Sequence, residues 1–333
     1  MKIIITNIPA FYKINLFNEI NKREPLLVIF CAPSSSQRNI DFYKGKSDFK
    51  SIFLSNNALK DIPALVKVII QNNYDEFIIG GWDNPLFLLS SIISPKSKNA
   101  VIVESSDYES RVNGLKGLIK RLFLCRVSKA YCSGTPHERL VRRLGFRGVA
   151  IKTLGVGLPN IPVRPDCDLR TEVKNFLYVG RLSEEKNLKY VIRTFNRHPE
   201  LNLHICGYGY QEEELKRIAG QNTIFHGAID NEDLSMYYQI YDVLILMSIS
   251  ETWGLVVEEA LMNNMPVLVS NMVGCREDIV KNDKYGLVID LAKNDFEEKL
   301  KEICDVERYN NIRREIQHID FKRRMSYQVE CYI

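Results

Sequence analysis

The sequence predicts an α/β protein with two doubly wound domains. Short apolar runs rich in β-branched residues alternate with longer amphipathic stretches along most of the chain, a pattern typical of parallel sheets covered by helices. A length of 333 residues is more than one hydrophobic core usually holds and suits two domains. The alternation also restarts after a proline-rich stretch near the middle, so we expect two sheets in succession.

The expected strands form two series. The first half holds seven, at residues 2–6, 26–31, 51–54, 76–79, 100–104, 130–132 and 150–154, with helices between them, for example at 11–21, 61–71 and 136–144. The second half holds six, at 176–179, 201–206, 223–225, 243–247, 266–270 and 286–289. Two series of this kind predict two Rossmann-like domains.

The boundary between the domains is expected within residues 158–166. This stretch holds three prolines and no amphipathic period, so it has the pattern of an extended linker. We assign 1–165 to the N-terminal domain and 166–310 to the C-terminal domain. Residues 311–333 are charged and helical in pattern, and we expect this tail to cross back to the N-terminal domain.

The composition is that of a globular protein, with 45% hydrophobic and 26% charged residues. No run approaches the roughly 18 uninterrupted apolar residues that span a bilayer. The first residues enter a strand-like run without the layout of a signal peptide, which predicts a cytoplasmic protein. The eight cysteines are scattered without the close pairs of a zinc or redox site, so we expect buried free thiols.

Positive charge is concentrated in one stretch. Between Arg111 and Lys152 there are eleven basic residues and a single acid, Glu138, which indicates an anionic partner or surface. Leucines, Ile119 and Phe123 interleave with lysines in its first part, as in a helix that lies on an anionic membrane. A core-packed helix with a solvated cationic face explains the pattern equally well. Nucleic acid is not favoured, because the stretch lacks interleaved stacking aromatics.

The most informative segment, residues 248–260, follows an apolar strand and opens a helix. A helix that begins near Trp253 directs its free N–H groups and positive dipole end beyond the strand, which creates an anion site suited to a diphosphate. Glu251 and Glu259 flank this helix start, up to about 12 Å apart along the axis. They could hold the two ends of an elongated ligand rather than share one metal. Taken alone, they are better explained as a first-turn residue and a solvated helix position.

A second segment, residues 180–187, also follows a strand and opens a helix. Arg181 can bind two phosphate oxygens in a fork and Lys186 supplies a mobile charge, so the pair could neutralise a diphosphate leaving group. Alone, such residues are usually surface charges. At the carboxyl end of a strand in an open parallel sheet, however, a ligand crevice is expected.

With these motifs the chain resembles the retaining GT-B glycosyltransferases of family GT4. The resemblance covers residues 174–290 closely and the first half more loosely. It rests on Gly-Arg-Leu-Ser-Glu-Glu-Lys-Asn at 180–187, Gly-Tyr-Gly at 207–209, Phe-His-Gly at 225–227, the E-x7-E pair at 251 and 259, and the segments 273–277 and 286–288. It implies a GT-B fold, in which two Rossmann-like domains have a cleft between them.

The resemblance also implies how the donor is held. The first glutamate, Glu251, would contact hydroxyls of the donor sugar, Glu259 the ribose hydroxyls, and Arg181 with Lys186 the diphosphate. Arg181, Lys186 and Glu251 are thus the expected catalytic residues. The expected donor-binding residues are Glu259, Gly254, Leu255, Trp253, Thr252, Phe225 and Gly227.

The first half resembles polysaccharide-assembly members of the family at 79–83 and 103–105. This makes 1–165 the expected acceptor-binding domain and 166–310 the nucleotide-sugar-binding domain. Many members carry a histidine in the acceptor-side loop, whereas this chain has Glu104, Ser105 and Asp107, which become the acceptor-side candidates. A usual aspartate is also replaced, by Leu158.

The implied reaction is hexosyl transfer with retained anomeric configuration from a nucleotide sugar, with UDP preferred over GDP, to a saccharide hydroxyl. No protein nucleophile is required, since the hydroxyl enters on the face that the nucleoside diphosphate leaves. No metal or cofactor is implied, and the one Asp-x-Asp, at 166–168, lies in the linker. With the basic stretch, the resemblance favours a lipid-linked, lipopolysaccharide or capsule intermediate as acceptor and a peripheral position at the inner face of the membrane.

Three other functions fit parts of the pattern. A nucleotide-sugar epimerase or hydrolase would use the same donor residues without an acceptor. A non-catalytic GT-B-like binding partner would keep the fold, but the presence of Arg181, Lys186, Glu251 and Glu259 speaks against it. An NAD-dependent enzyme is not favoured, because residues 7–10 after the first strand lack the glycine fingerprint.

Overall fold

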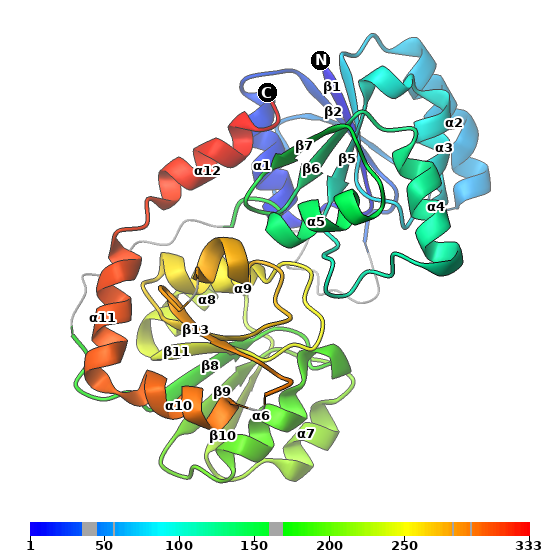
Figure 1. Ribbon diagram of the computed structural model, residues 1–333. Coiled ribbons are helices and arrows are strands. Elements are labelled where there is room, and N and C mark those ends of the chain that lie inside the picture. The colour runs from blue at the N-terminus through cyan, green and yellow to red at the C-terminus, as the bar shows by residue number, and fades with distance from the viewer. Residues whose placement is uncertain (35–44, 56, 160–168, 282, 294) are drawn as a thin grey trace. The chain divides into compact units, whose positions relative to one another are not determined.

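The chain forms two compact units, which we describe from a computed structural model (Figure 1). The first unit is Met1–Pro159 together with Lys322–Ile333, and the second is Asn160–Phe321. The structure describes residues 1–34, 45–55, 57–159, 169–281, 283–293 and 295–333. The predicted domain boundary at 165 and the Asp-x-Asp at 166–168 lie outside the described residues.

The first unit contains a seven-stranded parallel sheet in the order β3-β2-β1-β4-β5-β6-β7. The strands are β1 (Lys2–Thr6), β2 (Leu26–Phe30), β3 (Lys50–Phe53), β4 (Glu76–Ile79), β5 (Asn99–Val103), β6 (Lys129–Cys132) and β7 (Val149–Lys152). Between them lie α1 (Phe11–Asn21), α2 (Ala58–Gln71), α3 (Pro85–Ile93), the 3-10 turn η2 (Lys96–Lys98), α4 (Gly114–Leu124) and α5 (Thr135–Arg143). All seven predicted strands are confirmed to within two residues.

The central strands of this sheet are buried on both faces, as their continuous apolar runs require. Ile3 and Ile5 of β1 pack in one core cluster with side chains from α2, α3, α4 and α5. Ile4 points to the other face, where the cluster draws on α1 and on Val329 and Tyr332 near the C-terminus. Period-two alternation along one strand therefore serves two separate cores.

Local sequence sets where the helices of this unit begin. The Asn84 side chain accepts a hydrogen bond from the backbone N–H of Leu86, and Pro85 occupies the first helical position of α3. Asn57 caps α2 in the same manner through Lys60 N–H. These residues satisfy donors that a helix start leaves free, so the helices begin directly beyond the strand ends.

The second unit contains a six-stranded parallel sheet in the order β10-β9-β8-β11-β12-β13. The strands are β8 (Asn175–Val179), β9 (Asn202–Cys206), β10 (Thr223–Gly227), β11 (Val243–Leu246), β12 (Val267–Ser270) and β13 (Gly286–Ile289). The helical elements are η3 (Glu184–Lys186), α6 (Leu188–Phe195), α7 (Glu212–Ile218), α8 (Asn231–Ile240), α9 (Leu255–Met262), the π-helical turn η4 (Arg276–Val280), α10 (Phe296–Cys304) and α11 (Val306–Gln317). The six predicted strands are also confirmed to within two residues.

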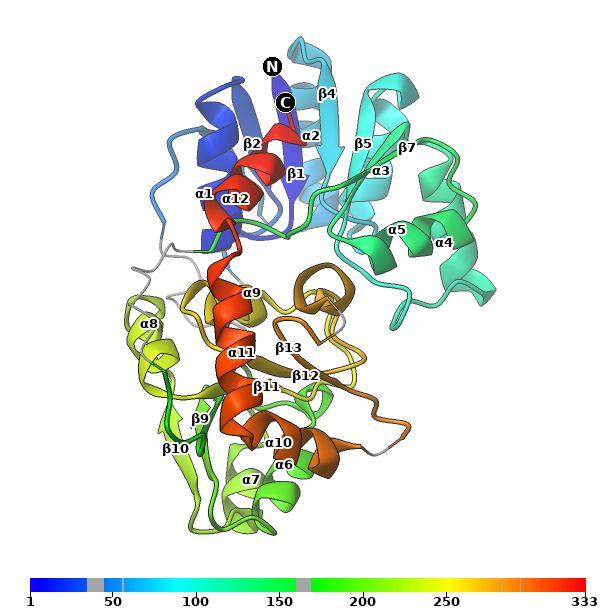
Figure 2. The ribbon, with the colours of Figure 1, turned by 60° about the vertical axis from the view of Figure 1, so that its left-hand side comes forward.

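The C-terminal tail divides between the two units. Helix α11 belongs to the second unit, whereas Lys322–Ile333 belongs to the first. Helix α12 (Phe321–Glu330) lies beside α1 on one face of the first sheet (Figure 2). The Tyr332 ring stacks on Tyr131 of β6, with 4.4 Å between centroids, and Lys2 donates to the Tyr332 carbonyl.

The cysteines depart partly from expectation. Seven lie within the described residues, and all are free. Cys31, Cys132, Cys206 and Cys275 are buried, Cys304 and Cys331 are partly buried, and Cys125 is exposed. The prediction of a buried thiol is wrong for Cys125, because it follows the last turn of α4 on the solvent side.

Candidate active site

The two segments that the sequence singles out follow neighbouring central strands of the second sheet. Residues 180–187 follow β8, and residues 248–260 follow β11. Strands β8 and β11 pair directly, and the connection order of the sheet reverses between them. Ligands of doubly wound sheets bind outside the carboxyl ends of the strands at such a reversal. The fold therefore brings the two segments to the place where a ligand crevice is expected.

Lys186 and Glu251 meet at this edge. Lys186 Nζ donates to Glu251 Oε2, and both side chains are mostly buried. Ser248 Oγ lies 3.5 Å from the same carboxylate oxygen. A lysine after β8 thus contacts a carboxylate after β11, across 65 residues of sequence.

Arg181 is held by a partner to which the sequence analysis gave no role. Arg181 Nη2 donates to Glu185 Oε1 at 3.0 Å, and Ser183 Oγ donates to the same oxygen at 2.6 Å. Burial acts to raise the pKa of Glu185, but the Ser183 hydrogen bond and the charges of Arg181 and Lys186 hold it below its ordinary value. Glu185 therefore holds the guanidinium, and about a third of the Arg181 side chain stays exposed.

Glycines allow the two loops after β8 and β9 to pack backbone to backbone. Gly180 has φ of +152° and Gly207 has φ of +151°. A Cβ on Gly207 would lie 1.8 Å from the Gly180 carbonyl oxygen, so no other residue fits there. Leu182 N–H donates to the Tyr208 carbonyl at 2.8 Å, which fixes the Arg181 loop on the Gly-Tyr-Gly turn.

The loop before α9 is pinned by backbone bonds to residues 273–275. Glu251 forms a parallel bridge with Val273, Gly274 N–H donates to the Glu251 carbonyl at 3.0 Å, and Cys275 N–H donates to the Trp253 carbonyl at 2.9 Å. Helix α9 begins at Leu255, within two residues of the predicted start near Trp253, and its N-cap Gly254 adopts φ of +98°. The free N–H groups of the helix start are therefore those just beyond Gly254.

Trp253 and Glu258 form a buried pair. Trp253 Nε1 donates to Glu258 Oε1 at 3.1 Å, and both side chains are almost completely buried. The Trp253 side chain thus supports the loop from below. Of the other candidates nearby, Thr252 is exposed and Leu255 is partly buried.

Glu259 lies in the second turn of α9, and its side chain is hydrogen-bonded to a residue of α8. Tyr238 Oη donates to Glu259 Oε2 at 2.8 Å, and the tyrosine is buried. Burial raises the pKa of Glu259 to about 7, and the nearby charge of Glu258 adds to this, whereas the Tyr238 hydrogen bond acts in the opposite direction. Glu259 retains some exposed surface, so it is a partly buried carboxyl whose charge changes near neutral pH.

Phe225 and Gly227 lie at the carboxyl end of β10. Gly227 adopts φ of +74°, and its carbonyl accepts a hydrogen bond from Gly207 N–H at 2.7 Å. The Phe225 ring is partly buried, with Lys216 Nζ 5.8 Å from its centroid. These residues therefore adjoin the same loops that carry Arg181.

The acceptor-side candidates lie in the first unit, after β5. Glu104 Oε1 lies 2.8 Å from Nζ of Lys13, a residue of α1 that the sequence analysis did not single out. Asp107 is bound through both oxygens by Arg139 of α5, at 3.0 and 3.1 Å. Ser105 is partly buried.

The replaced aspartate position has a structural role here. Leu158 is buried in the core cluster beside α1, and its N–H donates to the Tyr12 carbonyl at 2.9 Å. Its side chain therefore belongs to the core of the first unit.

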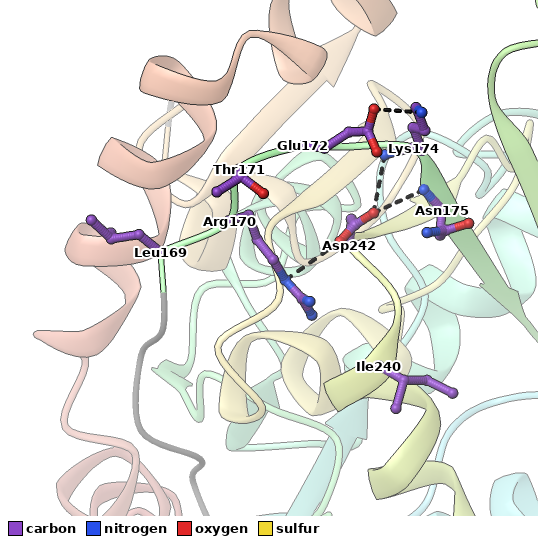
Figure 3. A pocket seen from close by; sticks show the side chains of 8 residues that line it. All are labelled: Leu169, Arg170, Thr171, Glu172, Lys174, Asn175, Ile240 and Asp242. Atoms are coloured by element: carbon purple, nitrogen blue, oxygen red, sulfur yellow. Dashed lines mark hydrogen bonds and ion pairs between the residues drawn. The ribbon is translucent and has the colours of Figure 1, made fainter.

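A pocket of about 310 Å³ lies at the opposite edge of the second sheet (Figure 3). Its lining residues precede or begin strands β8 and β11: Leu169, Arg170, Thr171, Glu172, Lys174, Asn175, Ile240 and Asp242. Asp242 accepts hydrogen bonds from the N–H groups of Lys174 and Asn175, and Arg170 lies 3.5 Å from it. The pocket contains none of the predicted site residues.

Among the described residues, no group of three or more His, Cys, Asp or Glu side chains lies close enough together to hold a metal ion. Within the same residues, no helix is both long and apolar enough to cross a membrane.

Comparison with known proteins identifies the family. A family model described as glycosyl transferases group 1 matches residues 163–318. The O-antigen biosynthesis glycosyltransferase WbnH of Escherichia coli is 31% identical over 254 residues, which cover 72% of this chain and 70% of that protein. The chain belongs to the glycosyl transferases group 1 family. A sulfoquinovosyl transferase of Arabidopsis thaliana is 33% identical to this glycosyltransferase over 111 residues, covering 33% of this chain and 22% of that protein.

Solved structures match the glycosyltransferase along nearly its whole length. The lipopolysaccharide outer core galactosyltransferase WaaB, in its apo form, gives a TM-score of 0.68 at 16% identity, covering 100% of both chains. HepE from Anabaena, in complex with UDP and glucose, gives 0.74 at 14% identity, covering 99% of this chain and 98% of that one. At these identities the likeness concerns the fold, and the two parallel sheets are those of GT-B enzymes, as the sequence predicts.

Proposed function

We propose that this glycosyltransferase moves a hexose from a nucleoside diphosphate sugar, UDP before GDP, to a hydroxyl of a saccharide with retained anomeric configuration. The observation that carries the proposal is the contact between Lys186 and Glu251 at the reversal point of the second sheet. A cation for phosphate and a carboxylate for sugar hydroxyls are side by side there. No protein nucleophile, metal ion or cofactor takes part in the proposed reaction.

Each donor-side residue has a part in this reaction. Arg181 and Lys186 neutralise the charge that grows on the departing diphosphate, and the N–H groups at the start of α9 add to this. Glu251 accepts hydrogen bonds from the sugar, and Glu259 from the ribose. The acceptor hydroxyl enters on the face that the diphosphate leaves, so most of the rate enhancement comes from orientation and charge stabilisation.

Relatives support the choice of donor and acceptor. The Escherichia coli relative is named for O-antigen biosynthesis, and the HepE structure contains UDP and glucose. We infer from these a UDP-sugar donor and an acceptor that is a lipid-linked saccharide, a lipopolysaccharide intermediate or a capsule intermediate. The enzyme would then act in the cytoplasm at the inner face of the membrane.

Helix α4 supports a peripheral position at the membrane. Leu115, Leu118, Ile119 and Leu122 follow the i, i+3, i+4, i+7 spacing of one helix face, and they are between 43% and 73% exposed. The helix lies within the stretch of eleven basic residues. An outward apolar face beside cations suits the interface of an anionic bilayer.

The cations in α4 and directly after it divide into two kinds. Lys120 donates to the Arg111 carbonyl at 3.2 Å, and Arg126 donates to the carbonyls of Ser91 and Ile92 at 3.3 Å. These two residues therefore help to hold α4 on the unit. Lys116 and Arg121 are exposed, so we assign contact with lipid phosphates to them.

A thermal-shift screen against UDP, GDP, ADP, TDP and NAD tests the donor assignment. A ligand that binds only the folded protein raises its apparent stability. We expect UDP to give the largest rise, and the Arg181→Ala and Glu259→Ala variants to lose it. Stabilisation by NAD alone, or by none of the five, would contradict the proposed donor site.

Flotation with vesicles tests the membrane contact. The wild-type protein should bind vesicles of phosphatidylglycerol and phosphatidylethanolamine, and the double variants Leu118→Asp with Leu122→Asp and Lys116→Glu with Arg121→Glu should be released. Leu59→Asp with Ile70→Asp, at exposed positions of α2, is the matched control and should bind normally. Failure of the wild type to bind, or equal release of the control, would contradict the assignment to α4.

A further inference from the structure

The first sheet has its own reversal point, between β1 and β4. Polar side chains gather where these strands end. Asn7, after β1, donates through Nδ2 to Asp83 Oδ2 at 2.9 Å, and Asn84 Nδ2 donates to Asn7 Oδ1 at 3.2 Å. Ligands of doubly wound sheets bind beyond the carboxyl ends of the strands where the connection order reverses, so a ligand of the first unit is expected at this edge.

An ion pair between a buried lysine and a partly buried glutamate lies at this same edge. Lys13, in the first turn of α1, places Nζ 2.8 Å from Oε1 of Glu104, which follows β5 beside β4. Although burial acts to lower the pKa of Lys13, the charge of Glu104, with smaller effects from Tyr12 and Asp83, holds it above its ordinary value. The lysine is 11% exposed and the glutamate 29% exposed. The cation is thus enclosed together with the carboxylate oxygen Oε1 that it faces, whereas part of the glutamate side chain stays exposed.

Stability alone is a weak reason for such a pair. Replacing a buried ion pair with apolar side chains of similar volume is often neutral or stabilising, because desolvation offsets the attraction between the charges. The neighbouring carboxylate Asp107 differs, since Arg139 occupies both of its oxygens.

The opposite edge of the sheet offers an internal comparison. There Glu76 lies 3.3 Å from Lys2 Nζ and 2.7 Å from Lys129 Nζ, and it accepts a hydrogen bond from Tyr131 at 2.9 Å. Its side chain is only 10% exposed. This second cluster lies at the amino ends of the strands, so it serves as a model of an ion pair with a purely structural role.

We infer that Glu104 recognises the acceptor by accepting a hydrogen bond from one of its hydroxyl groups, and that Lys13 is the positioning residue that keeps this carboxylate oriented. The inference rests on the proposed glycosyl transfer, because it supplies the acceptor side of that reaction. An ionised carboxylate is an acceptor of hydrogen bonds only, and a hydroxyl is a suitable donor for it. The ligand class is therefore a polyhydroxylated saccharide.

Steady-state kinetics of transfer from UDP-glucose, UDP-galactose or UDP-N-acetylglucosamine to octyl glycosides of glucose, galactose and N-acetylglucosamine test the pair. Lys13→Met and Glu104→Gln should each raise the KM for the glycoside about tenfold or more, as expected when a hydrogen bond to a charged group is lost. The KM for the donor and the slow hydrolysis of the donor without acceptor should stay unchanged. Lys13→Arg should restore part of the glycoside affinity.

Two controls separate recognition from folding. Lys2→Met, at the opposite edge, should lower the thermal midpoint without changing the KM for the glycoside. The double variant Lys13→Met with Glu104→Gln should recover stability relative to Lys13→Met alone, since no buried charge is left unpaired, but it should keep the raised KM.

Two results would overturn the inference, and they can be told apart. If the Lys13→Met and Glu104→Gln variants both transfer the sugar with the wild-type KM for the glycoside, the ion pair has only a structural role. A wild-type protein that neither binds a nucleoside diphosphate nor transfers a sugar would remove the proposed function itself, and the inference with it.

Discussion

The hydrogen bond from Tyr238 to Glu259 gives the sharpest prediction about donor binding. Glu259 is proposed to bind the ribose as a carboxylate, yet its pKa is raised to about 7 by burial. Tyr238→Phe removes the one contact, at 2.8 Å, that acts to lower this pKa. The variant should therefore bind UDP more weakly at neutral pH, although Tyr238 itself does not contact the ligand.

The size of the effect follows from the energy of this bond. A hydrogen bond to a charged group contributes roughly 1.5–3 kcal/mol, and about 1.4 kcal/mol corresponds to one pH unit. In the wild type, UDP affinity should rise with pH around a midpoint near the pKa of Glu259, about 7. In Tyr238→Phe the midpoint should move upward by about one pH unit or more, so that UDP affinity at pH 7 falls severalfold and recovers at pH 9.

Isothermal titration of UDP between pH 6 and pH 9 measures this directly. Glu259→Gln is the matched control, because its UDP affinity should keep only the pH dependence of the terminal phosphate of UDP, which has a pKa of about 6. Superimposable pH profiles for the wild type and Tyr238→Phe would refute the reasoning that Tyr238 controls the charge of Glu259.

Three further predictions concern stability and loop geometry. The pKa of Glu259 is raised from 4.5 to about 7 in the folded protein. Because the folded protein then binds this proton more tightly than the unfolded chain, the wild type should lose stability, on the order of 3 kcal/mol, as pH rises through this interval. Glu259→Gln should therefore melt at a higher temperature than the wild type at pH 8 but not at pH 4. Trp253→Phe leaves the buried Glu258 carboxylate without the 3.1 Å hydrogen bond from the indole, and urea unfolding should show a loss of about 1–3 kcal/mol, whereas an unchanged midpoint would exclude this role. Gly274→Ala places a Cβ 1.8 Å from the Thr252 carbonyl oxygen, so UDP affinity should fall while circular dichroism shows a folded protein; normal UDP binding would contradict the pinning of this loop.

The fold was predictable because it depends on local patterns. Most strands in the described residues are short apolar runs that alternate with helices, a pattern that predicts parallel sheets. The start of α9 lies within two residues of the predicted one, but its N-cap is not set locally: a Cβ on Gly254 would lie 3.1 Å from a methyl group of Val273, and the residue has φ of +98°. Neighbours distant in sequence decide such a detail, so a local pattern does not contain it.

The site was predictable only in part. Arg181, Lys186, Glu251 and Glu259 follow strand ends, where a ligand crevice is expected, but only the resemblance to a known family distinguishes them from ordinary surface charges. The residues that support the candidate site do not follow strand ends in this way. Tyr238 contacts Glu259 from helix α8, and in the first unit Lys13 contacts Glu104 from helix α1. Only the fold brings these partners together.

The apolar stripe of α4 is a third case. Its spacing in the sequence is equally typical of a helix packed on a core and of a helix on a membrane. The structure turns the stripe outward, and only three-dimensional packing determines that direction.

Release of UDP from a UDP-sugar, with and without an octyl glycoside, is the most direct test of the central claim. For the wild type we predict release that increases with glycoside concentration, in step with formation of the glycosylated product. Lys186→Ala should reduce the rate about a hundredfold, because a cation next to the leaving diphosphate is lost. Release that is independent of the glycoside would instead indicate a hydrolase, and an unchanged rate in Lys186→Ala would contradict the proposed site.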